Sequence, residues 1–136
     1  MLPSPPLHHH IIVGYHGCDQ SVAQKILLTG ELLNKSCNRY DWLGEGIYFW
    51  ETGYQRAWDF AKEQQVRGKI KTPCVIGAYL HLGRCFDLTD IWATTRLEHY
   101  YHLLVAECTA AGQTVPENLP ARPGDHDLLL RKLDCA

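Results

Sequence analysis

The stretch from Trp42 to Glu51 constrains the fold of this chain more than any other part of the sequence. Gly44 and Gly46 stand one residue apart and lead directly into four branched or aromatic residues, Ile47 to Trp50. Glycine permits unusual backbone angles or a close approach by a ligand, whereas branched and aromatic residues favour an extended strand. The pattern predicts a strand over residues 46–50. It leaves two interpretations open, a buried core strand or one wall of a binding site.

The composition indicates a globular protein with its own core. The chain has 136 residues, of which 46% are hydrophobic and 21% charged. We expect one domain over residues 11–136, preceded by a mobile arm over residues 1–10 whose prolines exclude a helix or a central strand. A formal net charge of −2 provides no overall basic field for nucleic acid or an anionic membrane.

The sequence also predicts where the protein works. No apolar run approaches the ~20 residues that a membrane-spanning helix requires. The N-terminus lacks the basic and apolar regions of a secretory signal. We therefore expect a cytoplasmic protein with no membrane partner.

The cysteines and histidines show no spacing typical of a metal site. The six cysteines contain no C-x-x-C pair, so they are predicted to be reduced and mostly buried thiols. His99 and His102 share one face of a predicted helix but lack a third ligand, and His8 to His10 would bind a metal weakly at most. No metal cofactor is expected. The cysteines are Cys18, Cys37, Cys74, Cys85, Cys108 and Cys135.

The hydrophobic periodicity predicts an α+β fold. A first helix is expected to begin after Asp19 or Ser21 and to end at Gly30, which is placed as its C-terminal stop. Asp90 is expected to cap a long helix, and Asp125 a last one. No convincing strand is predicted after Asp90. The predicted strands cover residues 11–15, 46–50 and 74–82, and the remaining helices cover residues 53–66, 91–110 and 126–135.

Two groups of residues have the chemistry of a binding site. His16 follows the first predicted strand and is able to donate to a ribose hydroxyl, while Gly17 leaves its N–H and C=O open to an amide-bearing ligand. The alternative is a turn histidine that meets only water. Tyr48, together with Phe49 or Phe60, is suited to stack on a planar ring. The alternative for these rings is core packing.

Four motifs occur in one order along the chain and carry a family resemblance. They are His16-Gly17-Cys18, Ile26-x-x-x-Gly30, Gly44-x-Gly46-Ile47-Tyr48-Phe49 and Arg56-Ala57-Trp58-Asp59-Phe60-Ala61. Together they resemble the catalytic domain of the poly(ADP-ribose) polymerase-like, or diphtheria-toxin-like, ADP-ribosyltransferases, and most closely the small bacterial and phage-type members. The resemblance covers Tyr15 to Ala61, roughly a third of the chain. It implies part of a split, mainly antiparallel sheet with helices, and the segment over about residues 90–136 is expected to be a helical insertion.

The resemblance implies that NAD⁺ is the substrate. ADP-ribose would be transferred to an unidentified protein or nucleic-acid acceptor, and nicotinamide would be released. His16 would contact the ribose, Gly17 would clamp the carboxamide, and Tyr48 would stack on the nicotinamide ring. Phe60 would supply the second aromatic ring and Ala57 the small residue beside the amide. The implied site is His16, Gly17, Cys18, Gly46, Tyr48, Phe49, Ala57 and Phe60, with His16 and Tyr48 as its catalytic members; Cys18 replaces the usual Ser or Thr.

The catalytic acid of the family is not evident in this sequence. Glu98 and Glu107 lie in the long predicted helix and are interpreted as solvated charges, and Glu117 is a weak loop candidate. Because the chain stops inside a helix-like pattern, we expect a truncated form that lacks the C-terminal strands and this acid. Arg39 to Asp41 would contact the acceptor. The alternatives are a catalytically inactive NAD⁺- or partner-binding fragment and an NAD⁺ glycohydrolase; a toxin-like role rests on analogy with small relatives.

Overall fold

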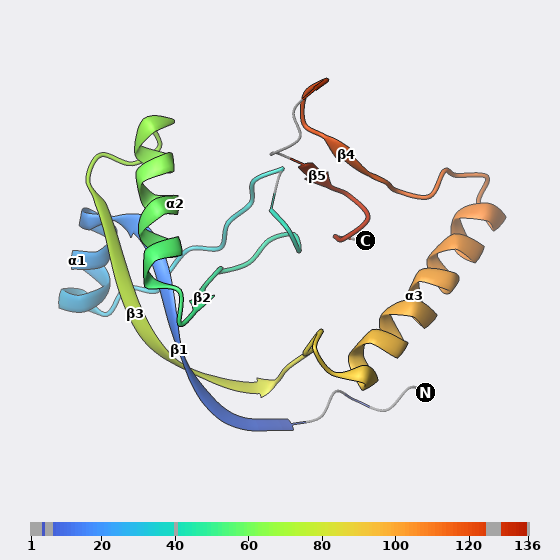
Figure 1. Ribbon diagram of the computed structural model, residues 1–136, viewed down its shortest axis with the longest axis horizontal. Helices are drawn as coiled ribbons and strands as arrows, with labels where there is room; N and C mark the ends of the chain where they lie inside the picture. The colour runs from blue at the N-terminus through green and yellow to red at the C-terminus, as the bar shows by residue number, and fades with distance from the viewer. Residues whose placement is uncertain (1–3, 5–6, 40, 125–128, 136) are drawn as a thin grey trace. The chain divides into compact units, whose positions relative to one another are not determined.

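The computed structural model describes residues 4, 7–39, 41–124 and 129–135, and these form a mixed α+β fold (Figure 1). The chain divides into two compact units. The sheet unit comprises Pro6–Lys35 and Ile47–Arg84, and the second unit comprises the remainder. The elements in order are β1 (Leu7–Asp19), α1 (Gln20–Thr29), β2 (Trp50–Glu51), α2 (Tyr54–Val66), β3 (Pro73–Arg84), α3 (Ile91–Ala110), β4 (Asn118–Pro120) and β5 (Leu129–Arg131).

The sheet unit is built on a long antiparallel pair of strands. The strand order is β2-β1-β3, so β1 is central. The register runs from Ile12 opposite Leu80 to Asp19 opposite Pro73. The predicted strands over 11–15 and 74–82 are confirmed, and both extend further. Residues 7–10, which the sequence assigns to an arm, belong to β1, with a register shift between His8 and Ile11.

The two helices of the sheet unit cover opposite faces of the β1–β3 pair (Figure 1). Neighbouring side chains in a strand point to opposite faces. A Cβ on Gly17 would meet the backbone carbonyl of Ala57, so Gly17 faces α2. Cys18 faces α1, where the backbone of Ala23 hydrogen-bonds to it. His16 therefore lies on the α1 face with Cys18.

The helix boundaries follow local signals in the sequence. Asp19 caps α1 through its side chain, which accepts from the backbone N–H of Ser21 at 3.0 Å. Gly30 has a φ of 69° and donates its N–H to the Ile26 carbonyl at 3.1 Å, as the predicted C-terminal stop requires. Asp90 caps α3 by accepting from the Trp92 N–H at 3.0 Å. The predictions for these three helix ends are confirmed.

The predicted strand over residues 46–50 is largely wrong. The paired strand β2 contains only Trp50–Glu51. Gly46 instead pairs with Ser36 and closes a loop. The Ser36 N–H donates to the Gly46 carbonyl at 2.6 Å, and the Gly46 N–H donates to the Ser36 carbonyl at 3.2 Å. Because these bonds use the backbone of Gly46 within the loop, the regular pairing with β1 begins only at Trp50.

The predicted C-terminal helix is also wrong, as is the expected absence of later strands. β5 pairs antiparallel with β4, and residues 132–135 form a turn, while residues 125–128 lie outside the described part of the chain. The Asn118 side chain accepts from the N–H groups of Leu133 (3.0 Å) and Asp134 (3.4 Å) and donates to the Asp134 carboxylate (2.7 Å). These bonds take the place of the hydrogen bonds of the helix predicted over residues 126–135.

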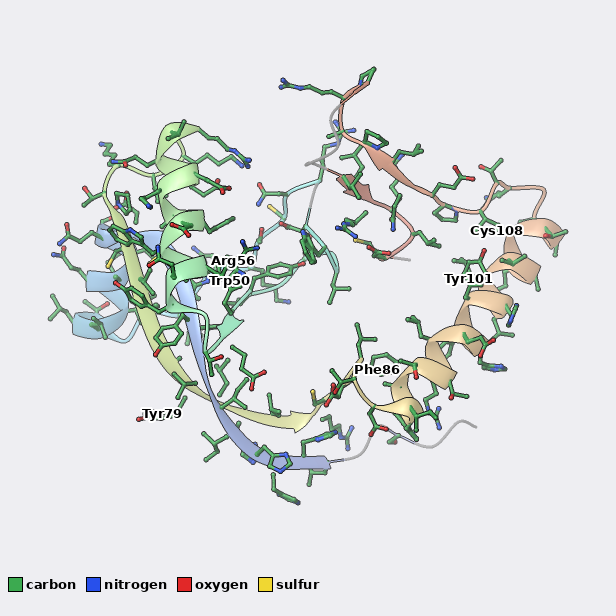
Figure 2. The ribbon with its side chains drawn as sticks, viewed as in Figure 1. Trp50, Arg56, Tyr79, Phe86, Tyr101 and Cys108 are labelled. Atoms are coloured by element: carbon green, nitrogen blue, oxygen red, sulfur yellow. The ribbon has the colours of Figure 1, made fainter. Side chains whose placement is uncertain are left out.

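The interior of the described residues is built from small side chains. None of the large side chains among them is fully buried. Within α3, Cys108 is buried, whereas Leu97 and Tyr101 are 52% and 45% exposed (Figure 2). The six cysteines are free, but only two of them are buried, two are half-buried and two are exposed, so the prediction of mostly buried thiols is wrong. The buried hydrophobic residues are Cys18, Ala23, Ala57, Ala61, Ala93 and Cys108.

Candidate functional site

His16 is held in a fixed orientation on the α1 face of β1. Its Nδ1 lies 2.8 Å from the backbone carbonyl of Tyr48, and its ring packs against Phe49 with centroids 5.6 Å apart. A carbonyl only accepts hydrogen bonds, so Nδ1 carries the proton and Nε2 of the neutral ring is an acceptor. A ligand hydroxyl would therefore donate to His16, the reverse of the predicted direction. The alternative of a turn histidine with no protein partner is wrong.

A cavity of about 760 Å³ opens beside His16, at the junction of β1, α1 and the segment that leads into β3. This volume lies within the range of small-molecule sites, about 300–1,000 Å³. All of its lining residues belong to the sheet unit. They are His16, Cys18, Asp19, Gln20, Ser21, Val22, Gln24, Leu33, Asn34, Lys69, Ile70, Lys71 and Thr72.

Asp19 organises the wall of this cavity. One carboxylate oxygen accepts from the N–H (3.0 Å) and Oγ (2.8 Å) of Ser21, and the other from the N–H groups of Lys71 (2.6 Å) and Thr72 (3.1 Å). These hydrogen bonds hold the pKa of Asp19 well below its usual range, with the Ser21 backbone as the largest cause. Asp19 therefore fastens residues 71–72 to the start of α1.

The same wall carries charged side chains of both signs. Lys69 and Lys71 line the cavity together with Gln20 and Ser21 from the first turn of α1. The two lysines add positive charge to that of the helix N-terminus, and the Asp19 carboxylate, which caps this helix, adds a negative charge. The sequence analysis did not assign these lysines to the site. Their signal was the basic run Lys69-Ile70-Lys71 just before β3, but only the register of β1 and β3 shows that it lies beside Asp19.

The backbone of Gly17 lies beyond the end of β2. The Val13 carbonyl accepts from the Thr52 N–H at 3.1 Å, so the backbone groups of Val13 point toward the β2 side. Alternate residues of a strand point their N–H and C=O to the same side, which places those of Gly17 on this edge. The pairing of β1 with β2 covers only Gly14 and Tyr15. Gly17 itself is buried, with Ala57 and Ala61 of α2 packed against it.

Other predicted site residues lie elsewhere. Phe60 packs against Trp50, with ring centroids 5.1 Å apart. Trp50 is the strand partner of Tyr15, and the Tyr15 ring packs against Tyr54 of α2. Phe60 thus lies on the α2 face, opposite to His16. Ala57 is completely buried against Gly17. The structure brings His16, Cys18, Phe49 and the Tyr48 backbone together but not Phe60 or Ala57, and Gly46 belongs to the second unit.

The candidate acids and acceptor contacts belong to the second unit. Glu98, Glu107 and Glu117 are all exposed. The Asp41 carboxylate accepts from Ser36 Oγ and Asn38 N–H, both at 2.7 Å, and so holds its own loop together. Arg39 is exposed, and Tyr40 lies outside the described residues.

Metal-binding and membrane-spanning features were sought in the described part of the chain. It contains no cluster of three His, Cys, Asp or Glu side chains that would hold a metal ion. Its longest helix, α3, is not apolar enough to cross a membrane, and the other helices of that part are too short.

Comparison with known proteins gives one informative match. A stretch of 93 residues, 66% of this chain, is 33% identical to an uncharacterized protein of Methanocaldococcus jannaschii. The chain spans 43% of the length of that protein. No protein-family model and no solved structure matches the chain.

Proposed function

We propose that this chain is an NAD⁺-binding, ADP-ribosyltransferase-like protein that transfers ADP-ribose from NAD⁺ to a macromolecular acceptor and releases nicotinamide. In this proposal the β2-β1-β3 sheet is part of the split antiparallel sheet of that family. The orientation and position of His16 carry the proposal. Its hydrogen bond to the Tyr48 carbonyl leaves Nε2 as an acceptor, and the residue lines a cavity of ligand size.

In this proposal the cavity holds the ribose and the phosphates, while Gly17 and Tyr48, which do not line it, hold the nicotinamide. A ribose hydroxyl would donate to His16 Nε2, and the phosphates would lie near Lys69 and Lys71. The nicotinamide carboxamide would bind the N–H and C=O of Gly17. The Tyr48 ring would stack on the nicotinamide, a contact that contributes about 0.5–1.5 kcal/mol beyond burial.

One observation favours the alternative of a protein that binds NAD⁺ without turning it over. Cleavage of the glycosidic bond builds oxocarbenium character, which a nearby carboxylate stabilises. Among the described residues that line the cavity, Asp19 is the only acid, and N–H and hydroxyl donors occupy both of its oxygens. An NAD⁺ glycohydrolase, in which water is the acceptor, would use the same site.

Incubation with labelled NAD⁺ separates these functions. A transferase releases nicotinamide and leaves label on protein or nucleic acid, whereas a glycohydrolase releases nicotinamide and free ADP-ribose. NAD⁺ binding without release of nicotinamide supports the alternative of a protein that binds NAD⁺ but does not turn it over. Absence of binding and of both products contradicts all three functions.

Substitution of Tyr48 tests its ring separately from its backbone. Tyr48→Ala removes the ring but keeps the carbonyl that orients His16. We expect NAD⁺ affinity, or nicotinamide release if the protein turns over, to fall roughly tenfold, because stacking and burial together contribute about 1–2 kcal/mol. The matched control is Tyr79→Ala, since Tyr79 is an exposed tyrosine of β3, at 83%, that has no place in the proposed site (Figure 2). Equal effects of the two substitutions would remove the Tyr48 ring from the site.

A further inference from the structure

Two cysteines face each other across the central pair of strands. Cys18 of β1 and Cys74 of β3 are direct partners in the antiparallel register. Direct partners project their side chains from the same face of the sheet, with Cα atoms about 4.5–5.5 Å apart. A disulfide requires a Cα separation of about 4.4–6.8 Å. The backbone therefore already places this pair at a separation that a disulfide can span.

The two thiols differ in accessibility. Cys18 is 7% exposed, whereas Cys74 is half-buried. Burial, and to a smaller degree the nearby Cys74, raise the pKa of the Cys18 thiol to about 11. A thiol in this state is a poor first nucleophile, because the thiolate is the reactive form. A reagent would thus react first at Cys74, and Cys18 would act second.

We propose that Cys18 and Cys74 form a reversible disulfide between β1 and β3, made by exchange with a small disulfide such as oxidised glutathione. The Cys74 thiol loses its proton, attacks the small disulfide and displaces one glutathione thiolate, which takes up that proton. Cys18 then loses its proton, attacks the Cys74 sulfur of the mixed disulfide and displaces the second glutathione as a thiolate, which takes up that proton. Two protein thiols are oxidised and one small disulfide is reduced to two thiols.

The position of Cys18 connects this reaction to the candidate site. Cys18 lines the cavity two residues from His16 and turns its sulfur toward Cys74 when the bond forms. The disulfide makes the shape of the cavity wall depend on redox state. An effect of this shape on NAD⁺ binding rests on the proposed function, whereas formation of the disulfide does not.

Peptide mapping of the oxidised full chain tests the disulfide. The protein is treated with oxidised glutathione under native conditions, its remaining thiols are alkylated, and it is digested with trypsin without reduction. Residues 1–25 and 72–84 form two tryptic peptides with one cysteine each, Cys18 and Cys74. We expect them to be joined, with the loss of two hydrogens, and to separate on addition of a reducing agent.

Two controls make the mapping decisive. Cys37, which is exposed, reports that the reagent is active by forming a mixed disulfide. In the Cys74→Ser variant, Cys18 should remain a free thiol after treatment with oxidised glutathione. Because it is buried, it should react with the alkylating reagent only after denaturation. If wild-type Cys74 stops at the mixed disulfide, or if Cys18 is recovered as a free thiol while Cys37 has reacted, the proposed disulfide is wrong.

Calorimetry with NAD⁺ tests the link to the cavity. We expect NAD⁺ to bind the reduced protein and to bind the disulfide form at least tenfold more weakly. Equal affinity of the two forms would contradict the redox dependence alone. If the reduced protein does not bind NAD⁺, the proposed function fails together with this link, and the peptide map still decides the disulfide.

Discussion

At the scale of single residues, Asp19 has the most connected side chain of the sheet unit. It begins α1 and also accepts hydrogen bonds from the backbone of Lys71 and Thr72, more than fifty residues later in the chain. One carboxylate thus fixes both sides of the cavity wall. The sequence predicts its capping role, because Asp before an amphipathic segment is a local signal. It does not predict the bonds to residues 71–72, which depend on the register of β1 and β3.

The lowered pKa of Asp19 predicts a pH-dependent effect on stability. An aspartate that is more acidic in the folded state than its unfolded value of about 3.9 stabilises the fold fully above that value. This contribution is lost as the pH falls below about 4 toward the folded pKa. We expect Asp19→Asn to lower the urea midpoint at pH 7, and the difference from the wild type to shrink between pH 4 and pH 2.

Circular dichroism at a series of pH values would measure this effect. The matched control is Asp59→Asn, because Asp59 is also a surface carboxylate with a lowered pKa but bonds only the side chains of Lys62 and Gln55. We expect it to have the smaller effect at pH 7. Curves for wild type and Asp19→Asn that run parallel at all pH values would rule out the role given to Asp19.

At the scale of secondary-structure elements, the close contact of α2 with β1 determines which face carries the site. The helix presents Ala57 and Ala61 to the sheet, and the Ala57 carbonyl occupies the space of a Gly17 side chain. This contact leaves His16 and Cys18 on the opposite face, beside α1. Gly17 therefore has a packing role in addition to the ligand role that the family resemblance implies.

The contact predicts that a side chain at position 17 is destabilising. Gly17→Ala would force α2 away from β1, and we expect the free energy of unfolding to fall by about 1–3 kcal/mol, as for an overpacked core. Gly77→Ala is the matched control, because its added Cβ would lie 3.3 Å from the movable ring of Tyr15. Urea denaturation should show the smaller loss for Gly77→Ala. Equal losses would contradict the packing of α2 on Gly17.

The elements differ in how well the sequence predicts them. The helix ends at Asp19, Gly30 and Asp90 were predictable because caps and glycine stops act within a few residues. The aromatic run before Trp50 suggested a strand, but the pairing of Gly46 with Ser36 is a contact that no local pattern reveals. The strands β4 and β5 have three residues each, too short for a period of two to be visible.

At the scale of the whole molecule, the candidate site is contained in one of two compact units. Residues of β1, α1 and the segment before β3 line the cavity, and all of them belong to the sheet unit. The sequence predicts His16, Gly17 and Cys18 because they are adjacent and share a motif. It does not predict Lys69 and Lys71, which antiparallel pairing brings to the same place from the far end of α2.

Titration calorimetry with NAD⁺ tests the central claim, that the His16 cavity is an NAD⁺ site, most directly. We expect the wild-type chain to bind NAD⁺ and His16→Ala to bind roughly fivefold to tenfold more weakly, since one hydrogen bond contributes about 0.5–1.5 kcal/mol. His81→Ala, an exposed histidine of β3 outside the cavity, should bind as the wild type does. No binding by the wild type, or equal affinity of wild type and His16→Ala, would contradict the claim.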